Sequence, residues 1–200
     1  ENEKLPSKLL PYALIYFEDN IREDAISTIK WFKDNDVQIK IISGDDPVTV
    51  SEIARRAGVD NADKYINLDG LNEKEVFNVA SEYTVFGRVS PEQKAILIKS
   101  LKAHGHTVAM TGDGVNDILA MKESDCSITV ASGSEATRHI AHLVLMNNDF
   151  SSLPSVVNEG RRVVNNIQSS SSLYLMKTLF TAIFAIITIL RKSTYPFKVA

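Results

Sequence analysis

The sequence predicts an α/β fold, a Rossmann-like parallel sheet with flanking helices, followed by a C-terminal helix long enough to span a membrane. Two observations support this prediction. Apolar runs typical of buried strands alternate with amphipathic helical segments from residue 12 to residue 146. Near residue 173 the composition changes, and 173–190 is apolar apart from hydroxyl groups and Lys177.

The expected elements follow one another in a regular order. Strands are expected at 12–17, 37–42, 83–87, 106–110, 126–130 and 143–146, and helices at 21–35, 46–59, 90–105, from Val115 onward and at 133–142. Pro47 opens the second of these helices and Gly58 ends it, in the positions where proline and glycine commonly bound a helix. The alternation implies a parallel sheet with helices on both faces.

Composition excludes several classes of protein. The chain of 200 residues is 44% hydrophobic and 24% charged, which is typical of a globular protein with a sizeable core. A net charge of -3 and the absence of a basic stripe give no sign of a nucleic-acid partner. The single cysteine, Cys126, excludes an internal disulfide and any metal site built from cysteines.

The apolar segment 173–190 is interpreted as a membrane span. Its 18 residues would form a helix of about 27 Å, close to the hydrocarbon thickness of a bilayer. Lys177, one turn inside, can extend its ammonium group to the interface. A buried core helix is the alternative, because the charge-free run 178–190 has only 13 residues. The residues between, 151–172, are expected to form a helix leading to the span, and 191–200 a loop after it.

Polar clusters directly follow three of the expected strands. They are Phe-Glu-Asp at 17–19, Ser-Gly-Asp-Asp at 43–46 and Thr-Gly-Asp-Gly at 111–114. In parallel sheets of this kind the binding crevice lies beyond the carboxyl ends of the strands. We therefore expect these clusters to meet at one edge.

The residue types in these clusters suit phosphoryl transfer. Asp113 and Asp117 offer the oxygen ligands that Mg²⁺ prefers, and the neighbouring glycines allow backbone to approach a ligand closely. Ser43 and the Gly44 amide can donate hydrogen bonds to phosphoryl oxygens, and Lys94 can add an ammonium group. Each feature alone is more often a turn, a helix cap or a solvated charge, so the prediction depends on their joint occurrence.

The motifs resemble those of P-type ATPases, within the haloacid-dehalogenase superfamily. "MTGDGVNDILAMKESD" resembles that family's hinge motif, and "KIISGDDPVTVSEIARRAGV", "GRVSPEQKAILIKSLKAHGH" and "FEDNIRED" match neighbouring motifs in the expected order. "FSSLPSVVNEGRRVVNNIQ" resembles the stalk that leads into the fifth transmembrane helix. The resemblance covers residues 12 to 190 and is nearest to a bacterial branch of cation pumps with members linked to calcium.

The resemblance implies a role for each matching residue. Asp113 would be the Mg²⁺ ligand, Asp117 the carboxylate that supports the phosphorylation site, and Asn116 its hydrogen-bonding neighbour. Ser43 stands in place of a phosphate-contacting threonine, with Gly44 and Asp45 completing that motif, and Lys94 matches the lysine that neutralises phosphate.

Asp19 and Arg22 match the hinge toward the nucleotide-binding domain, with Asn20 and Ile21 in place of two prolines. Arg88 lies in the motif of Lys94. Asp19, Arg22 and Arg88 are the expected residues on the ATP side.

The family's acceptor motif, Asp-Lys-Thr-Gly-Thr, has no match in this chain, because Asp63-Lys64 is followed by Tyr65. The resemblance therefore implies an internal fragment of a pump, with residues 1–150 the C-terminal part of the phosphorylation domain. Alone, the fragment is expected to be inactive. Implied partners are ATP, Mg²⁺, a transported cation for which Ca²⁺ is one candidate, a lipid bilayer and the remaining domains of the pump. The parent would be a multi-pass protein of the cell membrane, with residues 1–172 cytoplasmic.

Two other interpretations remain open at this point. A soluble phosphatase of the same superfamily would need its own nucleophilic aspartate and would lack the apolar segment 173–190. A non-catalytic module anchored in a membrane would use the carboxylates only to form turns. Detergent partition tests the first alternative, and Mg²⁺-dependent protection of residues 109–125 from hydrogen exchange tests the second.

Overall fold

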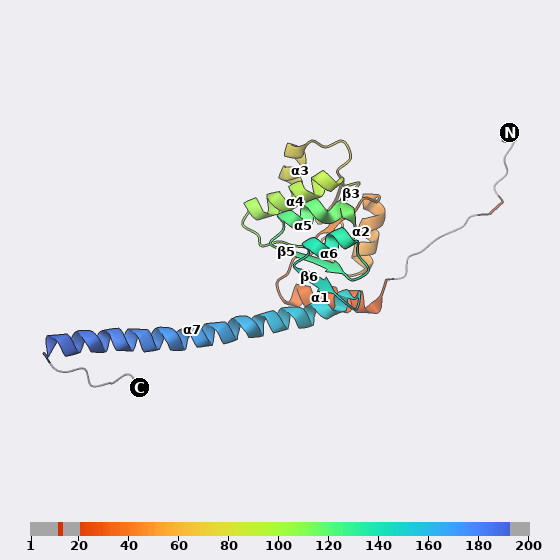
Figure 1. The fold of residues 1–200 in the computed structure, drawn as a ribbon. Helices are drawn as coiled ribbons and strands as arrows, with labels where there is room; N and C mark the ends of the chain where they lie inside the picture. The colour runs from red at the N-terminus through yellow and green to blue at the C-terminus, as the bar shows by residue number, and fades with distance from the viewer. Residues whose placement is uncertain (1–11, 14–20, 193–200) are drawn as a thin grey trace. The chain divides into compact units, whose positions relative to one another are not determined.

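The computed structural model describes residues 12–13 and 21–192, and the chain divides into two compact units, Glu1–Ser151 and Ser152–Ala200. In the first unit, strands alternate with helices along the chain (Figure 1). The elements of this unit are α1 (Glu23–Asp34), β1 (Ile41–Ile42), α2 (Pro47–Arg56), β2 (Tyr65–Asn67), α3 (Glu73–Val79), β3 (Val85–Gly87), α4 (Pro91–Ala103), β4 (Ala109–Thr111), the 3-10 turn η1 (Val115–Asp117), α5 (Ile118–Glu123), β5 (Cys126–Val130), α6 (Glu135–Ile140) and β6 (Leu143–Leu145).

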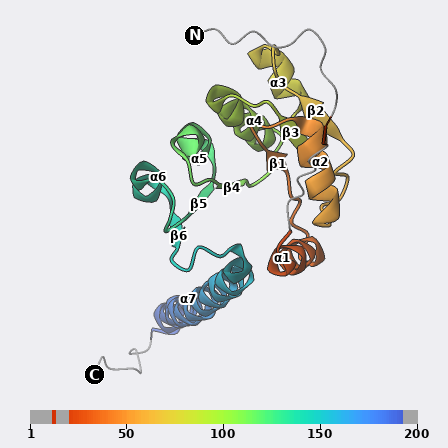
Figure 2. The same cartoon turned by 90° about the vertical axis from the view of Figure 1, so that its right-hand side faces the viewer.

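All of the strand pairs within residues 21–192 are parallel, which confirms the predicted fold class. The strands form two three-stranded sheets, ordered β1-β3-β2 and β4-β5-β6. Ile42 pairs with Phe86 in the first sheet, and Thr111 pairs with Ile128 in the second. Figure 2 shows the six strands following one another in a row, with β1 and β4 as the facing edges. Among the described residues these two edge strands are not hydrogen-bonded to each other.

Helices cover both faces of the first sheet, as neighbouring residues of β3 illustrate. Val85 packs with Val50 and Ala54 of α2, whereas Phe86 packs with Val76 of α3 and Leu97 of α4. Successive side chains of a strand point to opposite faces, so the apolar run of β3 is buried on both sides. In Figure 2, α1 and α2 accordingly lie on one side of the row of strands, and α4, α5 and α6 on the other.

Local sequence signals explain where the helices begin. Asp46 accepts hydrogen bonds from the backbone of Val48 and Thr49, and Pro47 occupies the first turn of α2. Asn72 and Ser90 each form a capping box, with Glu75 at α3 and with Gln93 at α4. These caps satisfy backbone N–H groups that would otherwise have no partner at the start of each helix.

Apart from shifts of a few residues at the ends of other elements, the structure differs from the expected elements in three main places. β1 contains two residues instead of the predicted six, because only Ile41 and Ile42 are in register with β3. The segment 60–82, for which no element was expected, contains β2 and α3. The strand predicted at 12–17 falls mainly outside the described residues.

The second unit is dominated by one helix. After the short turn η2 (Phe150–Ser152), α7 (Leu153–Leu190) continues for 38 residues, so the predicted stalk and span belong to a single helix. Its apolar part is long enough to cross a membrane, with a mean hydropathy of 2.1 and only 6% of that stretch buried within the protein. Ile183, Ile186 and Leu190 are among the exposed apolar side chains there. Exposure of this kind is typical of a helix that packs against lipid or other helices.

Candidate functional site

A nearly buried ion pair joins two of the predicted site residues. The Lys94 Nζ atom lies 2.7 Å from Asp117 Oδ1, and the two side chains are 13% and 12% exposed. Lys94 comes from the first turns of α4 and Asp117 from η1, so the pair depends on the packing of α4 against η1 and α5. The Gly114 amide donates to the other carboxylate oxygen at 3.3 Å.

The backbone before Asp117 approaches its side chain very closely. A Cβ atom added to Gly112 would lie 2.4 Å from the Asp117 Cβ and 2.8 Å from its Oδ2. Gly112 itself is anchored to the second sheet, since its N–H donates to the Ile128 carbonyl. Glycine is required at this position because any side chain would displace the carboxylate that pairs with Lys94.

Asp113 lies between these two glycines, at the carboxyl end of β4. Its carbonyl is hydrogen-bonded, whereas its carboxylate takes part in no hydrogen bond or ion pair with the described residues and is exposed. A single free carboxylate fits the chemistry of Mg²⁺, which takes one or two protein carboxylates and fills its remaining positions with water and phosphate oxygens. No group of three or more His, Cys, Asp or Glu side chains within residues 12–13 and 21–192 is placed to hold a metal.

The Ser43 loop is connected to the helix that carries Lys94. The Val89 amide donates to the Ser43 carbonyl, and the Arg88 amide donates to the Asp45 carbonyl, at 3.1 and 2.9 Å. Ser90 follows directly and caps α4. Within the loop, the Ser43 hydroxyl lies 3.2 Å from Asp45 Oδ2 and accepts the Asp45 N–H. The two motifs are therefore joined by backbone contacts, as their positions after β1 and β3 predict.

The other predicted residues are less closely connected to Lys94, Asp113 and Asp117. The Arg22 guanidinium pairs with Asp24 and lies 3.6 Å from Asp149; the hydrogen bond to Asp24 is the main cause that raises its pKa. Arg88 is exposed and has a positive φ of 54°. Asn116 is exposed, and its side chain makes no hydrogen bond to any other described residue. Asp19 lies outside the described residues.

Three residues near Asp113 were not predicted from the sequence. Gly133, Ser134 and Thr137 contact or approach its backbone, although the segment 133–142 was interpreted only as the start of a helix. These three residues are 20 to 24 positions from Asp113 in the sequence, so no local pattern could have indicated the contact.

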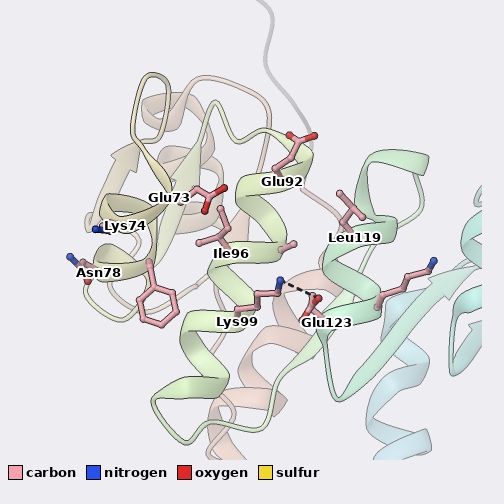
Figure 3. A pocket seen from close by; sticks show the side chains of 11 residues that line it. Glu73, Lys74, Asn78, Glu92, Ile96, Lys99, Leu119 and Glu123 are labelled. Atoms are coloured by element: carbon pink, nitrogen blue, oxygen red, sulfur yellow. Dashed lines mark ion pairs between the residues drawn. The ribbon is translucent and has the colours of Figure 1, made fainter.

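A cavity elsewhere on the first unit contains none of the predicted site residues. It has a volume of about 650 Å³ and lies between α3, α4 and α5 (Figure 3). Phe77, Ile96 and Leu119 line it, and two other lining residues, Lys99 and Glu123, form an ion pair of 3.4 Å. The candidate site is therefore not found by cavity size. It lies where Ser43 follows β1 and Asp113 follows β4, at the carboxyl ends of these strands.

Known proteins provide independent comparisons. A family model described as haloacid dehalogenase-like hydrolase matches residues 3–125. The chain is 49% identical over 184 residues to a probable cation-transporting ATPase, exp7, of Streptococcus pneumoniae, and 41% identical over 187 residues to the calcium-transporting ATPase CtpE of Mycobacterium bovis. Among solved structures, a zinc-transporting PIB-type ATPase in its E2.Pi state superposes with a TM-score of 0.67 at 24% identity, which shows the fold alone.

These matches cover most of this chain but a small part of the other proteins. The alignments include 92% and 94% of the chain, and 24% of each of the two curated relatives. The superposition with the zinc-transporting ATPase covers 89% of this chain and 25% of that one. The chain thus spans about a quarter of the length of the proteins it resembles.

Proposed function

Because the chain belongs to the haloacid dehalogenase-like hydrolases, whose family model matches residues 3–125, we propose that it is part of an ATP-driven cation pump. The family resemblance indicated by the sequence motifs is thereby confirmed. In this proposal, residues 1–150 are the C-terminal part of the phosphorylation domain, 151–172 the stalk, 173–190 a membrane span and 191–200 the loop after it. The two curated relatives named above, a probable cation-transporting and a calcium-transporting ATPase, support the assignment to pumps.

The proposal depends mainly on one arrangement, in which Asp117, the partner of Lys94, lies in the same motif as the free carboxylate of Asp113. A phosphoryl group in transfer spreads negative charge over its equatorial oxygens, and cations placed in advance around those oxygens lower the barrier. The Lys94 ammonium keeps two N–H donors after pairing with Asp117, and these can serve the phosphoryl oxygens. Asp117 thus holds the ammonium in place.

Asp113 would hold Mg²⁺, with Asp117 close by in the same loop. Bound there, the ion would neutralise charge on the phosphoryl oxygens and orient them. The Ser43 hydroxyl, now beside Asp45, and the Gly44 amide would donate hydrogen bonds to the same group. Asn116, exposed in η1, is free to contact the phosphoryl group or its acceptor. Asp19, Arg22 and Arg88 are proposed for the side of the site that faces ATP.

The two sheet edges suggest where the missing acceptor belongs. β1 and β4 each have one unpaired edge among the described residues. Ile42 of β1 and Val108, which directly precedes β4, pack against the same apolar cluster of α3, β3 and α4. A parallel strand inserted between them would join the two sheets and end between Ser43 and Asp113. We propose that the parent pump supplies this strand with its acceptor aspartate, so that phosphorylation produces an aspartyl-phosphate at the site.

The cargo of the pump is proposed to be a metal cation, and Ca²⁺ is the first candidate because one relative is a calcium transporter. The helix α7 would pass through the cell membrane as one of several spans, with residues 1–172 on the cytoplasmic side. The lipid bilayer, ATP and the other domains of the pump are the remaining partners in this proposal.

The decisive experiment measures phosphorylation of the parent pump by ATP. We expect Mg²⁺-dependent incorporation of phosphate in the unaltered protein and a loss of at least 100-fold in Asp113→Ala, in line with the effect of removing a charge-stabilising group. Asp69→Ala, at an exposed carboxylate in a turn far from Asp113 in sequence, is the control and should retain full phosphorylation. Undiminished phosphorylation in Asp113→Ala would refute the role proposed for this site.

A further inference from the structure

The backbone of Asp113 is held by a second segment of the chain. Its carbonyl accepts the Ser134 N–H at 2.8 Å, and the Thr137 hydroxyl lies 3.3 Å from the same oxygen. Ser134 caps the short helix α6, and Thr137 lies within it. Both residues follow β5, whereas Asp113 follows β4, so the contact crosses between two neighbouring strands of the second sheet.

Thr137 is connected to Ser134 as well as to Asp113. The Thr137 amide donates to Ser134 Oγ at 3.2 Å, the two hydroxyl oxygens are 3.0 Å apart, and the Thr137 hydroxyl donates to the Ser134 carbonyl at 2.7 Å. Thr137 is completely buried. Its hydroxyl therefore sets the position of Ser134, whose N–H in turn holds the Asp113 carbonyl.

Close packing leaves this segment little freedom to move. A Cβ atom added to Gly133 would lie 2.8 Å from Thr129 Oγ1 and 3.2 Å from the Asp113 carbonyl oxygen. The 2.8 Å contact is shorter than real Cβ atoms show, and at 3.2 Å the Asp113 carbonyl would have to move by a few tenths of an ångström to make room for a side chain at Gly133. Gly112, on the other side of Asp113, is similarly confined by Asp117.

These contacts hold the backbone of Asp113 in place, while its carboxylate has no partner among the described residues. We infer that Thr137 is a positioning residue, which fixes the backbone of Asp113 so that its carboxylate is aimed correctly for a divalent cation. The inference rests on the proposed function, in which Asp113 holds Mg²⁺. Residues that orient a metal ligand through hydrogen bonds commonly change metal affinity by 10- to 100-fold. They do so without touching the metal.

The test uses pairs of substitutions in the full chain in detergent micelles. Thr137→Val keeps the shape of the side chain and removes the hydroxyl. Thr137→Ser is the opposite change, which keeps the hydroxyl and removes the methyl group. Thr129→Val is the matched control, because Thr129 is also completely buried but its hydroxyl has no hydrogen-bond partner among the described residues. For each variant we would measure hydrogen exchange of residues 112–114 without metal, and the affinity for Mg²⁺ alone by calorimetry.

We expect Thr137→Val to speed exchange at residues 112–114 and to weaken Mg²⁺ binding about tenfold. Thr137→Ser and Thr129→Val should remain close to the unaltered chain in both measurements. Equal Mg²⁺ affinity in Thr137→Val and the unaltered chain would overturn the inference, and so would an equal loss in Thr137→Val and Thr129→Val, which would indicate a general packing defect. Absence of Mg²⁺ binding by the unaltered chain would overturn the proposed metal site itself and the inference with it.

Discussion

Lys94 and Asp117 form an ion pair of 2.7 Å in which both side chains are nearly buried, although they are 23 residues apart in the sequence. Lys99, only five residues later on the same helix, pairs with Glu123 at 3.4 Å while its side chain is 55% exposed. The two pairs join neighbouring elements through the same types of charge, and they differ mainly in burial. Loss of the Lys94–Asp117 pair is therefore expected to lower the free energy of unfolding much more than loss of the Lys99–Glu123 pair.

Lys94→Met is expected to lower the free energy of unfolding by about 3 kcal/mol, because it leaves the Asp117 carboxylate buried without its counter-charge. Lys99→Met should change the stability by less than about 1 kcal/mol, as is usual for exposed pairs. Urea unfolding of both variants measures the difference.

A double-mutant cycle tests whether the cost in Lys94→Met comes from the pair itself. Asp117→Asn combined with Lys94→Met should cost less than the sum of the two single substitutions, with a coupling of about 2 kcal/mol. Strict additivity would mean that the two side chains do not interact in solution.

Gly112→Ala is expected to destabilise the protein by about 1–3 kcal/mol, because the new methyl group would lie 2.4 Å from the Asp117 Cβ. Gly44→Ala is the control, since a Cβ atom there meets nothing within 4 Å. Thermal unfolding compares the two variants, and a loss in Gly44→Ala as large as in Gly112→Ala would show that the close approach is not the cause.

The order of strands and helices was largely predictable from the sequence, because it depends on local patterns. β5 (Cys126–Val130) matches its predicted bounds, and α4 begins one residue inside the prediction, where Ser90 and Gln93 form a capping box. The helix α3 was missed, although Asn72 and Glu75 have the spacing of the same capping motif. A search for that spacing would have found it.

The site was only partly predictable, for a physical reason. The motifs indicated which strand ends carry Ser43, Asp113 and Asp117, because that depends on the register of each segment with the sheet. Which partner each side chain contacts depends on how distant segments pack. The pairing of Lys94 with Asp117 and the contact of Thr137 with Asp113 therefore required the structure.

Acidification is expected to destabilise the protein partly through Asp125. Its carboxylate accepts the Val108 N–H at 2.9 Å and pairs with Lys102 at 2.9 Å, and these contacts, the backbone hydrogen bond first, hold its pKa below the ordinary value of 3.8. Because the pKa is lower in the folded state, the contribution is fully present well above pH 4. It is lost as the pH falls through the folded pKa.

Asp125→Asn should therefore flatten the dependence of the unfolding midpoint on pH below about pH 4, where the unaltered chain loses stability most steeply through this group. Lys102→Met removes the weaker of the two favourable contacts and should have an intermediate effect. Urea unfolding between about pH 2 and about pH 6, roughly two units on either side of the ordinary carboxylate pKa, provides the measurement. Unchanged acid dependence in Asp125→Asn would contradict the assignment.

Ile183→Lys tests whether the apolar part of α7 enters a bilayer. Ile183 is half-exposed within that part of the helix, and a lysine at the centre of a span costs about 3 kcal/mol of insertion free energy. Ser171→Lys adds the same charge to the polar stretch before 173–190 and should have little effect. Flotation of the chain with lipid vesicles measures partition, and we expect strong association for the unaltered chain and Ser171→Lys and a marked loss for Ile183→Lys. If the unaltered chain stays in the buffer, or if both lysine variants float equally well, α7 does not insert through this stretch.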